Sequence, residues 1–218
     1  MIAVITFYTP EYKQEADEWR KTCHAFLQPE LNCTKPNTEN IIQYPFKSYD
    51  MPSKKSWVHN CTMKAEVILK AMEEFKCGIV WTDADARFRA FPTAFAELEN
   101  YDFGCYWIPN VWNQPRNAPL KPWSRGNEAL NGSTLFFNNT EKSKKLLYDW
   151  KKESEANPTR WEQQSLQKVW EQHDNAGLKT YNFNQGYAKV FDVKWFEGEY
   201  PLVIEQMQAS RKLKNKIK

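Results

Sequence analysis

Short apolar runs alternate along the chain with longer stretches in which apolar residues recur every three or four positions. Ile2–Tyr8 is an apolar run of strand length, and we expect it to form a buried first strand that ends at Thr9-Pro10. Between Ala16 and Phe26 the apolar residues have helical spacing, which predicts an amphipathic helix. A Pro- and Asn-rich connection then leads to a short strand predicted at Ile41–Tyr44.

The polar stretch FKSYDMPSKKS at 46–56 precedes the strongest helical pattern of the chain. Gly78 lies just beyond this helix, where a helix commonly ends. Gly78–Thr82 is then a short apolar run that predicts a strand. The helix is predicted from six apolar residues that form one stripe: Cys61, Ala65, Ile68, Leu69, Met72 and Phe75.

The second half of the chain is less regular. A loop rich in proline, asparagine and tryptophan at 109–128 is unusually long, and long ordered loops in compact domains are commonly binding loops or lids. Asn131-Gly132 predicts a tight turn into a strand that runs to Asn138, because both residues tolerate positive φ. The remaining predicted elements are a short helix near 95–99, strands at 103–108, 191–195 and 202–204, and helices at about 141–156 and 160–172.

This order of strands and helices predicts an α/β fold with a mostly parallel central sheet. The 218 residues, 41% of them apolar, are enough for one sizeable core, so we expect a single domain over 1–218. We expect 1–105 to form a nucleotide-binding half and 106–210 an acceptor-side half, followed by a basic tail at 211–218.

Charge and cysteine content narrow the class of protein further. The net charge is +3, but the tail holds five of the 30 basic residues, which leaves 25 against 27 acidic ones and a body of net charge −2. The tail is interpreted as a solvated end or as an arm for an anionic partner. Five scattered cysteines form no zinc-binding pattern, and no signal peptide or membrane span is evident. We therefore expect a cytoplasmic protein of bacterial or viral origin.

The main chemical signal is the acidic motif IVWTDADARF. In an extended backbone residues two apart point to the same side, so Asp83 and Asp85 can face one point in space. Two carboxylates at the carboxyl end of a strand suit Mg²⁺ or Mn²⁺, and open α/β sheets bind their ligands at this edge. An isolated Asp-x-Asp triplet is most often a surface turn, so the preceding apolar strand is what favours a metal site.

At these residues the chain resembles the nucleotide-diphospho-sugar transferases, a family of glycosyltransferases with the Rossmann-like GT-A fold. The resemblance extends over nearly the whole chain and rests on several modest motifs in the family's order. These motifs are ITFYT, WVHNCTMKAEVILKAM, WTDADARF, NGSTLFFNN, WEQQSL and PLVIEQMQASRK.

The resemblance implies a role for each matching residue. A divalent cation, Mn²⁺ or Mg²⁺, would be held by Asp83, Asp85 and Gln206, where the family often has a histidine in place of the glutamine. The nucleotide would contact Thr6, Tyr8, Thr9, Trp57, Lys64, Asp83 and Ser210. The sugar and acceptor would contact Asn131, Gly132, Ser133, Trp112 and Trp123, and the catalytic residues would be Glu162, Gln163 and Arg211.

Several of these residues also have a purely structural interpretation. Thr6 and Tyr8 could simply end a strand, Lys64 could be a solvated helix lysine, and Arg211 could belong only to the basic tail. Thr159-x-x-Glu162 is a capping box, in which Glu162 would bond back to the first amides of its helix. As an alternative, the family match places Glu162 at the acceptor, where it can bind the donor sugar or accept a proton.

The predicted function is transfer of a sugar from a UDP- or GDP-sugar to an acceptor hydroxyl. The acceptor is a glycan, a protein or a hydroxylated DNA base, and the Trp- and Arg-containing loop suits sugar stacking and nucleic-acid contact equally well. The alternative is a noncatalytic module that binds glycans or nucleic acid, which Gln206 favours. The stereochemistry and the oligomeric state are not predicted.

Overall fold

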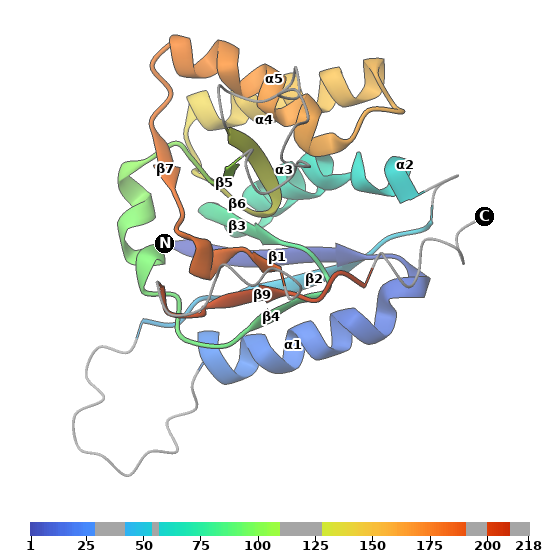
Figure 1. Cartoon of the computed structure of the whole chain (residues 1–218), viewed down its shortest axis with the longest axis vertical. Helices are drawn as coiled ribbons and strands as arrows, with labels where there is room; N and C mark the ends of the chain where they lie inside the picture. Colours follow the sequence, from blue (N-terminus) through green and yellow to red (C-terminus); the bar gives the residue numbers. More distant parts are fainter. Residues whose placement is uncertain (29–41, 54–56, 110–127, 191–199, 210–218) are drawn as a thin grey trace.

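The computed structural model describes residues 1–28, 42–53, 57–109, 128–190 and 200–209. These residues form a single α/β domain with a six-stranded central sheet of order β2-β1-β3-β6-β5-β7, in which β6 alone runs against the others (Figure 1). This confirms the predicted, mostly parallel sheet. The strands are β1 (Ile2–Tyr8), β2 (Phe46–Asp50), β3 (Gly78–Thr82), β5 (Phe103–Pro109), β6 (Glu128–Phe137) and β7 (Thr180–Asn182).

Helices cover both faces of this sheet, with α1 on one side and α3, α4 and α5 on the other (Figure 1). Alternation along β1 divides its side chains between two cores, because Ile2 and Val4 pack with Trp19 of α1 while Ala3 and Ile5 pack with Ile68 of α3. The helices are α1 (Lys13–Leu27), α2 (Trp57–Cys61), α3 (Lys64–Phe75), α4 (Glu141–Ala156) and α5 (Glu162–Asn175), with 3₁₀ turns at Pro10–Tyr12, Thr93–Asn100 and Gln185–Tyr187.

A second, three-stranded sheet brings the end of the described chain back to the acidic motif. Its order is β4-β9-β8, formed by Ala86–Phe88, Ile204–Gln206 and Lys189–Val190. The antiparallel β4–β9 pair places Gln206 opposite Ala86, which directly follows Asp85. Residues far apart in sequence therefore meet at the carboxyl end of β3.

The strand predicted at Gly78–Thr82 is confirmed as β3, and α3 ends before it at Phe75, where Lys76 with its left-handed φ of 55° is the C-cap. Two other local predictions were wrong. The second strand is Phe46–Asp50, because this segment, though polar, pairs in parallel with β1, whereas 42–45 has no regular structure. Glu162 is the first residue of α5 and follows the N-cap Trp161, so no capping box forms.

Asn131-Gly132 was also predicted wrongly, since it makes no tight turn. Both residues lie inside β6, and among the described glycines only Gly177 has a positive φ. The β5–β6 register jumps from Leu135 to Asn131, so the residues between them bulge away from β5. The bulge, rather than a turn, directs this segment toward the end of β3. The strands predicted at 191–195 lie outside the described residues, and the one at 202–204 begins later, at Ile204.

Gly186 packs closely against the backbone of Pro201. A Cβ at Gly186 would lie 2.1 Å from the carbonyl oxygen of Pro201, in the segment that leads into β9. We expect Gly186→Ala to lower the free energy of unfolding by about 1–3 kcal/mol or more, because the backbone must shift. Urea denaturation measures this loss.

Gly177→Asn is the control, because asparagine tolerates a positive φ and the nearest atom is 3.9 Å from its Cβ. Equal stability of Gly186→Ala and the native protein would contradict the packing of β9.

Candidate functional site

A pocket of about 120 Å³ lies at the carboxyl ends of β1 and β3, the edge predicted for ligand binding. Its wall combines aromatic side chains with three carboxylates and one lysine. The lining residues are Phe7, Tyr8, Thr9, Tyr12, Asn60, Cys61, Lys64, Trp81, Asp83, Ala84, Asp85, Glu162, Gln206 and Gln208.

The segment Asp83–Ala86, called the acidic loop below, is a tight turn fixed from both sides. The amide of Ala86 donates to the carbonyl of Asp83 at 2.9 Å, and the amide of Asp83 donates to the carbonyl of Ser133 in the β6 bulge at 3.0 Å. The amide of Ala209 donates to Asp85 Oδ2 at 2.6 Å. Asp83 and Asp85 thus both line one pocket, but a turn places them there and not the extended backbone from which their spacing was interpreted.

Lys64, the first residue of α3, lies between two of the carboxylates. Its Nζ is 2.8 Å from Asp83 Oδ1 and 3.0 Å from Glu162 Oε1, and it donates to the carbonyl of Gly132 at 3.1 Å. The ammonium also lies 5.4 Å from the centre of the Trp81 ring. The lysine side chain is only 6% exposed, so it is a buried ionic centre and not a solvated helix lysine.

Burial and charge shift the pKa of each of these groups. Burial alone would lower the pKa of Lys64, but the charges of Asp83 and Glu162 together raise it above its ordinary value. Burial also raises the pKa of Asp83, although Lys64 opposes this effect. Burial, followed by repulsion from Asp83, raises the pKa of Asp85 to about 6. Within the described residues Asp85 forms no ion pair, whereas Asp83 and Glu162 both pair with Lys64.

Gln206 completes the polar end of the pocket. It is 1% exposed, and its Nε2 donates to Thr134 Oγ1 at 3.3 Å. Its Oε1 is buried without a hydrogen-bond partner in the described part of the chain, an arrangement that costs free energy unless a ligand satisfies the oxygen. The described residues contain no cluster of three or more His, Cys, Asp or Glu suited to a metal ion. Asp83, Asp85 and this amide oxygen are instead hard donors that suit Mg²⁺ or Mn²⁺.

The residues predicted for the nucleotide are only partly brought together. Tyr8 and Thr9 line the pocket, but Thr6 is fully buried and does not line it. Trp57 begins α2, and Ser210 lies outside the described residues. Sequence reasoning did not assign seven of the lining residues to the site: Phe7, Tyr12, Asn60, Cys61, Trp81, Ala84 and Gln208. Asn60 and Cys61 lie four and three positions before Lys64, and helical spacing from that lysine could have identified them.

On the acceptor side, the β6 bulge contacts the start of α5. A Cβ at Gly132 would lie 3.2 Å from Gln163 Cβ and 3.5 Å from Glu162 Oε1, so only glycine fits this contact without displacing a neighbour. Asn131 accepts a bond from the amide of Ser133 at 2.8 Å, and neither residue lines the pocket. The predicted residues Trp112, Trp123 and Arg211 lie outside the described part of the chain.

Comparison with known proteins agrees with this geometry. The fold is similar to the crystal structure of a glycosyltransferase involved in the glycosylation of the major capsid of PBCV-1, with a TM-score of 0.64, 12% identity and coverage of 99% of this chain and 98% of that one. No curated protein matches the sequence. None of the described helices has the length and apolar character that crossing a membrane requires. The family profile of nucleotide-diphospho-sugar transferases matches residues 20–218, and the chain therefore belongs to that family.

Proposed function

We propose that this protein transfers a sugar from a UDP- or GDP-linked donor, bound in the pocket with Mn²⁺ or Mg²⁺, to an acceptor hydroxyl. The family and fold support sugar transfer in general. The observation that carries the finer proposal is that Asp83, Asp85 and Gln206 line one pocket, while the buried amide oxygen of Gln206 has no hydrogen-bond partner among the described residues.

The charge of the pocket supports a divalent cation. The described lining residues include the carboxylates of Asp83, Asp85 and Glu162 and, among them, a single cation, Lys64. With all of them ionised the net charge is −2, which one Mn²⁺ or Mg²⁺ would neutralise. Buried carboxylates without compensation destabilise a fold, so a bound cation removes an electrostatic cost of the apoprotein.

Asp83, Asp85 and Gln206 would hold the metal ion, which when bound supplies positive charge to stabilise the leaving diphosphate. Both hydrogen bonds to Asp83, from Lys64 and from Trp81, go to Oδ1. Lys64 and Trp81 thus orient the carboxylate, whose side chain is still 33% exposed. A ligand oriented in this way is preorganised for the cation.

The wall at the end of β1 would bind the nucleotide. Tyr8 and Thr9 offer a ring for stacking and a hydroxyl for hydrogen bonding, and the proposal assigns Trp57 to the same wall. Lys64 adds positive charge at the base of the pocket, although its ammonium is already bonded to two carboxylates. Ser210 and Arg211 are proposed to contact the diphosphate, for which a guanidinium is well suited.

Glu162 and Gln163 are proposed to act where the donor sugar meets the acceptor. Glu162 is 7% exposed, and its Oε1 is held by Lys64 at 3.0 Å on the pocket wall. A carboxylate fixed there can accept the proton of an acceptor hydroxyl or bind a hydroxyl of the donor sugar. Gln163 packs against Gly132 and would support this side of the pocket.

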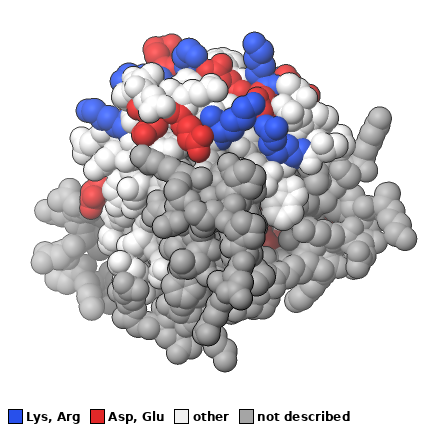
Figure 2. All heavy atoms as spheres, turned by 45° about the horizontal axis from the view of Figure 1, so that its top comes forward, with Lys and Arg blue, Asp and Glu red and all other residues white. Residues whose placement is uncertain are grey.

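The acceptor is proposed to be a glycan, a protein or a modified DNA base. Over α4 and α5, Figure 2 shows side chains of both charge signs interspersed. Ion pairs such as Lys145–Asp149 and Lys151–Glu155 account for part of this pattern. The described residues over α4 and α5 therefore form no basic stripe of the kind that a nucleic-acid backbone requires.

Asp85→Asn separates metal binding from folding. Because burial raises the pKa of Asp85 above its value in the unfolded chain, ionised Asp85 destabilises the fold at pH values above about 6. At pH 7.5 we expect the variant to raise the melting temperature of the apoprotein by roughly 2–6 °C. We also expect it to abolish the further rise that UDP or GDP produces with Mn²⁺ in the native protein.

Thermal-shift assays with and without Mn²⁺ measure both effects. The control is Asp149→Asn on α4, which removes an ion-paired carboxylate outside the pocket and leaves the Mn²⁺-dependent shift intact. An Asp85→Asn protein that still responds to Mn²⁺ and nucleotide would overturn the assignment of Asp85 to the metal site.

Lys64→Met tests the buried ionic centre. It leaves Asp83 and Glu162 without their shared cation, so we expect the free energy of unfolding at pH 7.5 to fall by about 3–5 kcal/mol in urea titrations. Lys64→Met/Glu162→Gln should recover part of that loss. Lys70→Met, an exposed lysine of the same helix, is the control. A loss no greater than that of the control would show that the pairing contributes nothing to stability.

Glu162→Gln tests whether the charge of this carboxylate is needed for catalysis, because the glutamine side chain has nearly the same shape. The amide oxygen can still accept from Lys64, so nucleotide affinity should be kept, whereas kcat for Mn²⁺-dependent donor hydrolysis should fall by about 10²- to 10⁴-fold. Nucleoside diphosphate release from a panel of UDP- and GDP-sugars measures the rate, with exposed Glu171→Gln as the control. An unchanged kcat would remove Glu162 from the mechanism.

No hydrolysis of any donor by the native protein, together with tight glycan or DNA binding, would favour a noncatalytic module.

A further inference from the structure

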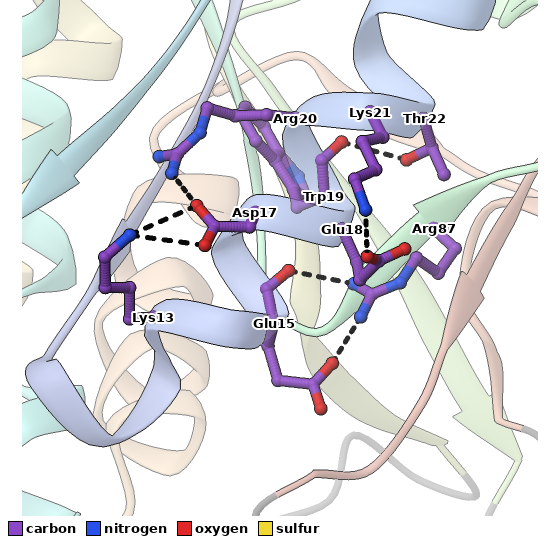
Figure 3. Close-up of polar contacts among 9 residues, drawn as sticks. All are labelled: Lys13, Glu15, Asp17, Glu18, Trp19, Arg20, Lys21, Thr22 and Arg87. Carbon is purple, nitrogen blue, oxygen red and sulfur yellow. Dashed lines mark hydrogen bonds and ion pairs between the residues drawn. The ribbon is translucent and has the colours of Figure 1, made fainter.

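Arg87 directly follows the acidic loop, and its side chain joins that loop to the first turn of α1 (Figure 3). Nη1 donates to the carbonyl oxygens of Ala86, Glu15 and Ala84 at 2.8, 3.2 and 3.5 Å. Nη2 forms an ion pair with the carboxylate of Glu15. The arginine side chain is 9% exposed, so solvent screens these contacts weakly.

Two further hydrogen bonds fix α1 to the same region. Trp19 Nε1 donates to Thr82 Oγ1 at 2.7 Å, and the amide of Phe88 donates to Thr22 Oγ1 at 3.2 Å. The other ion pairs of α1 in Figure 3 join residues of the helix to one another. Among the ion pairs drawn there, only the one made by Arg87 connects α1 to the acidic motif.

This connection spans the two walls of the pocket. One wall is the acidic loop, and the other consists of Tyr8, Thr9 and Tyr12, which directly precede α1. A shift of α1 relative to the loop would therefore change the opening between the aromatic wall and the carboxylates.

We propose that Arg87 is a positioning residue that sets the width of this opening, and thereby the affinity for a nucleoside diphosphate. The inference rests on the proposed function of the pocket. Arginine is required because its planar guanidinium reaches the Glu15 carboxylate and three carbonyl oxygens together. The ammonium of a lysine cannot reproduce this planar set of bonds.

The test compares Arg87→Lys and Arg87→Met with Arg89→Met. Arg89 lies two residues further along and forms a more exposed ion pair with Glu205, outside the pocket lining, so it is the matched control. Calorimetric titration of the full chain with UDP and with GDP at saturating Mn²⁺, below the melting temperature of each variant, gives Kd. Hydrogen exchange then measures the exchange rates of the backbone amides of 8–20 and 83–88.

We expect both Arg87 variants to weaken UDP or GDP binding by about 10- to 100-fold, since small displacements in a binding site are costly. We also expect the backbone amides of both segments to exchange faster in the Arg87 variants, whereas Arg89→Met should keep the native Kd and the native exchange rates. Native Kd and native exchange in Arg87→Lys would overturn the proposal, as would equal losses in Arg89→Met.

Two further measurements distinguish a failure of this proposal from a variant that does not fold and from a failure of the proposed function. If Arg87→Met does not fold, Arg87→Lys and Glu15→Gln decide the question. Glu15→Gln keeps the carbonyl bonds of Arg87 but removes the charge pair, so it should weaken binding less than Arg87→Lys. If the native protein binds neither UDP nor GDP, the proposed function fails. In that case the amide exchange rates of 83–88 alone decide the question: faster exchange in the Arg87 variants supports a positioning role of Arg87, and native rates overturn it.

Discussion

The arrangement of the pocket depends on one buried cation among three carboxylates. Lys64 bonds to Asp83 and to Glu162, so the start of α3 holds together the end of β3 and the start of α5. A buried ion pair gains little net stability, but removal of one partner leaves a buried charge and is costly. This asymmetry couples the carboxylate proposed for the metal to the carboxylate proposed for the acceptor side, and neither can change charge or position independently of Lys64.

The topology explains why such distant residues meet. Parallel strands β1 and β3 deliver Tyr8 and Asp83 to one edge, and the bulge in β6 turns the carbonyls of Gly132 and Ser133 toward that edge. The returning strand β9 then places Gln206 beside the acidic loop. The lining groups come from separate elements, so the pocket forms only when β1, β3, β9 and the starts of α3 and α5 are brought together.

Local patterns predicted the parts of this structure that depend on local physics. The apolar run of β1 and the stripe of α3 each fix an element on their own, and both of these predictions were confirmed. Asp83 and Asp85 do line one pocket, but a turn brings them there and not the extended backbone that their spacing assumed. The predictions that failed depend on distant partners. The polar segment Phe46–Asp50 is a strand because β1 pairs with it. Glu162 makes no capping box because α5 begins at Glu162 itself, after the N-cap Trp161, and its side chain bonds to Lys64.

A weak ligand can still serve in the proposed metal site, and Gln206 illustrates why. Its amide oxygen is neutral and attracts a cation less strongly than a carboxylate would. Its position is nevertheless fixed, because Nε2 bonds to Thr134, whose hydroxyl in turn donates to the carbonyl of Tyr187 at 2.7 Å. The buried oxygen has no partner in the described chain, so a cation that binds it recovers a desolvation cost already present in the apoprotein. In the proposed site a third donor of this kind favours metal binding that depends on the phosphates of the donor, because the two aspartates and one amide leave about half of an octahedral shell to the ligand.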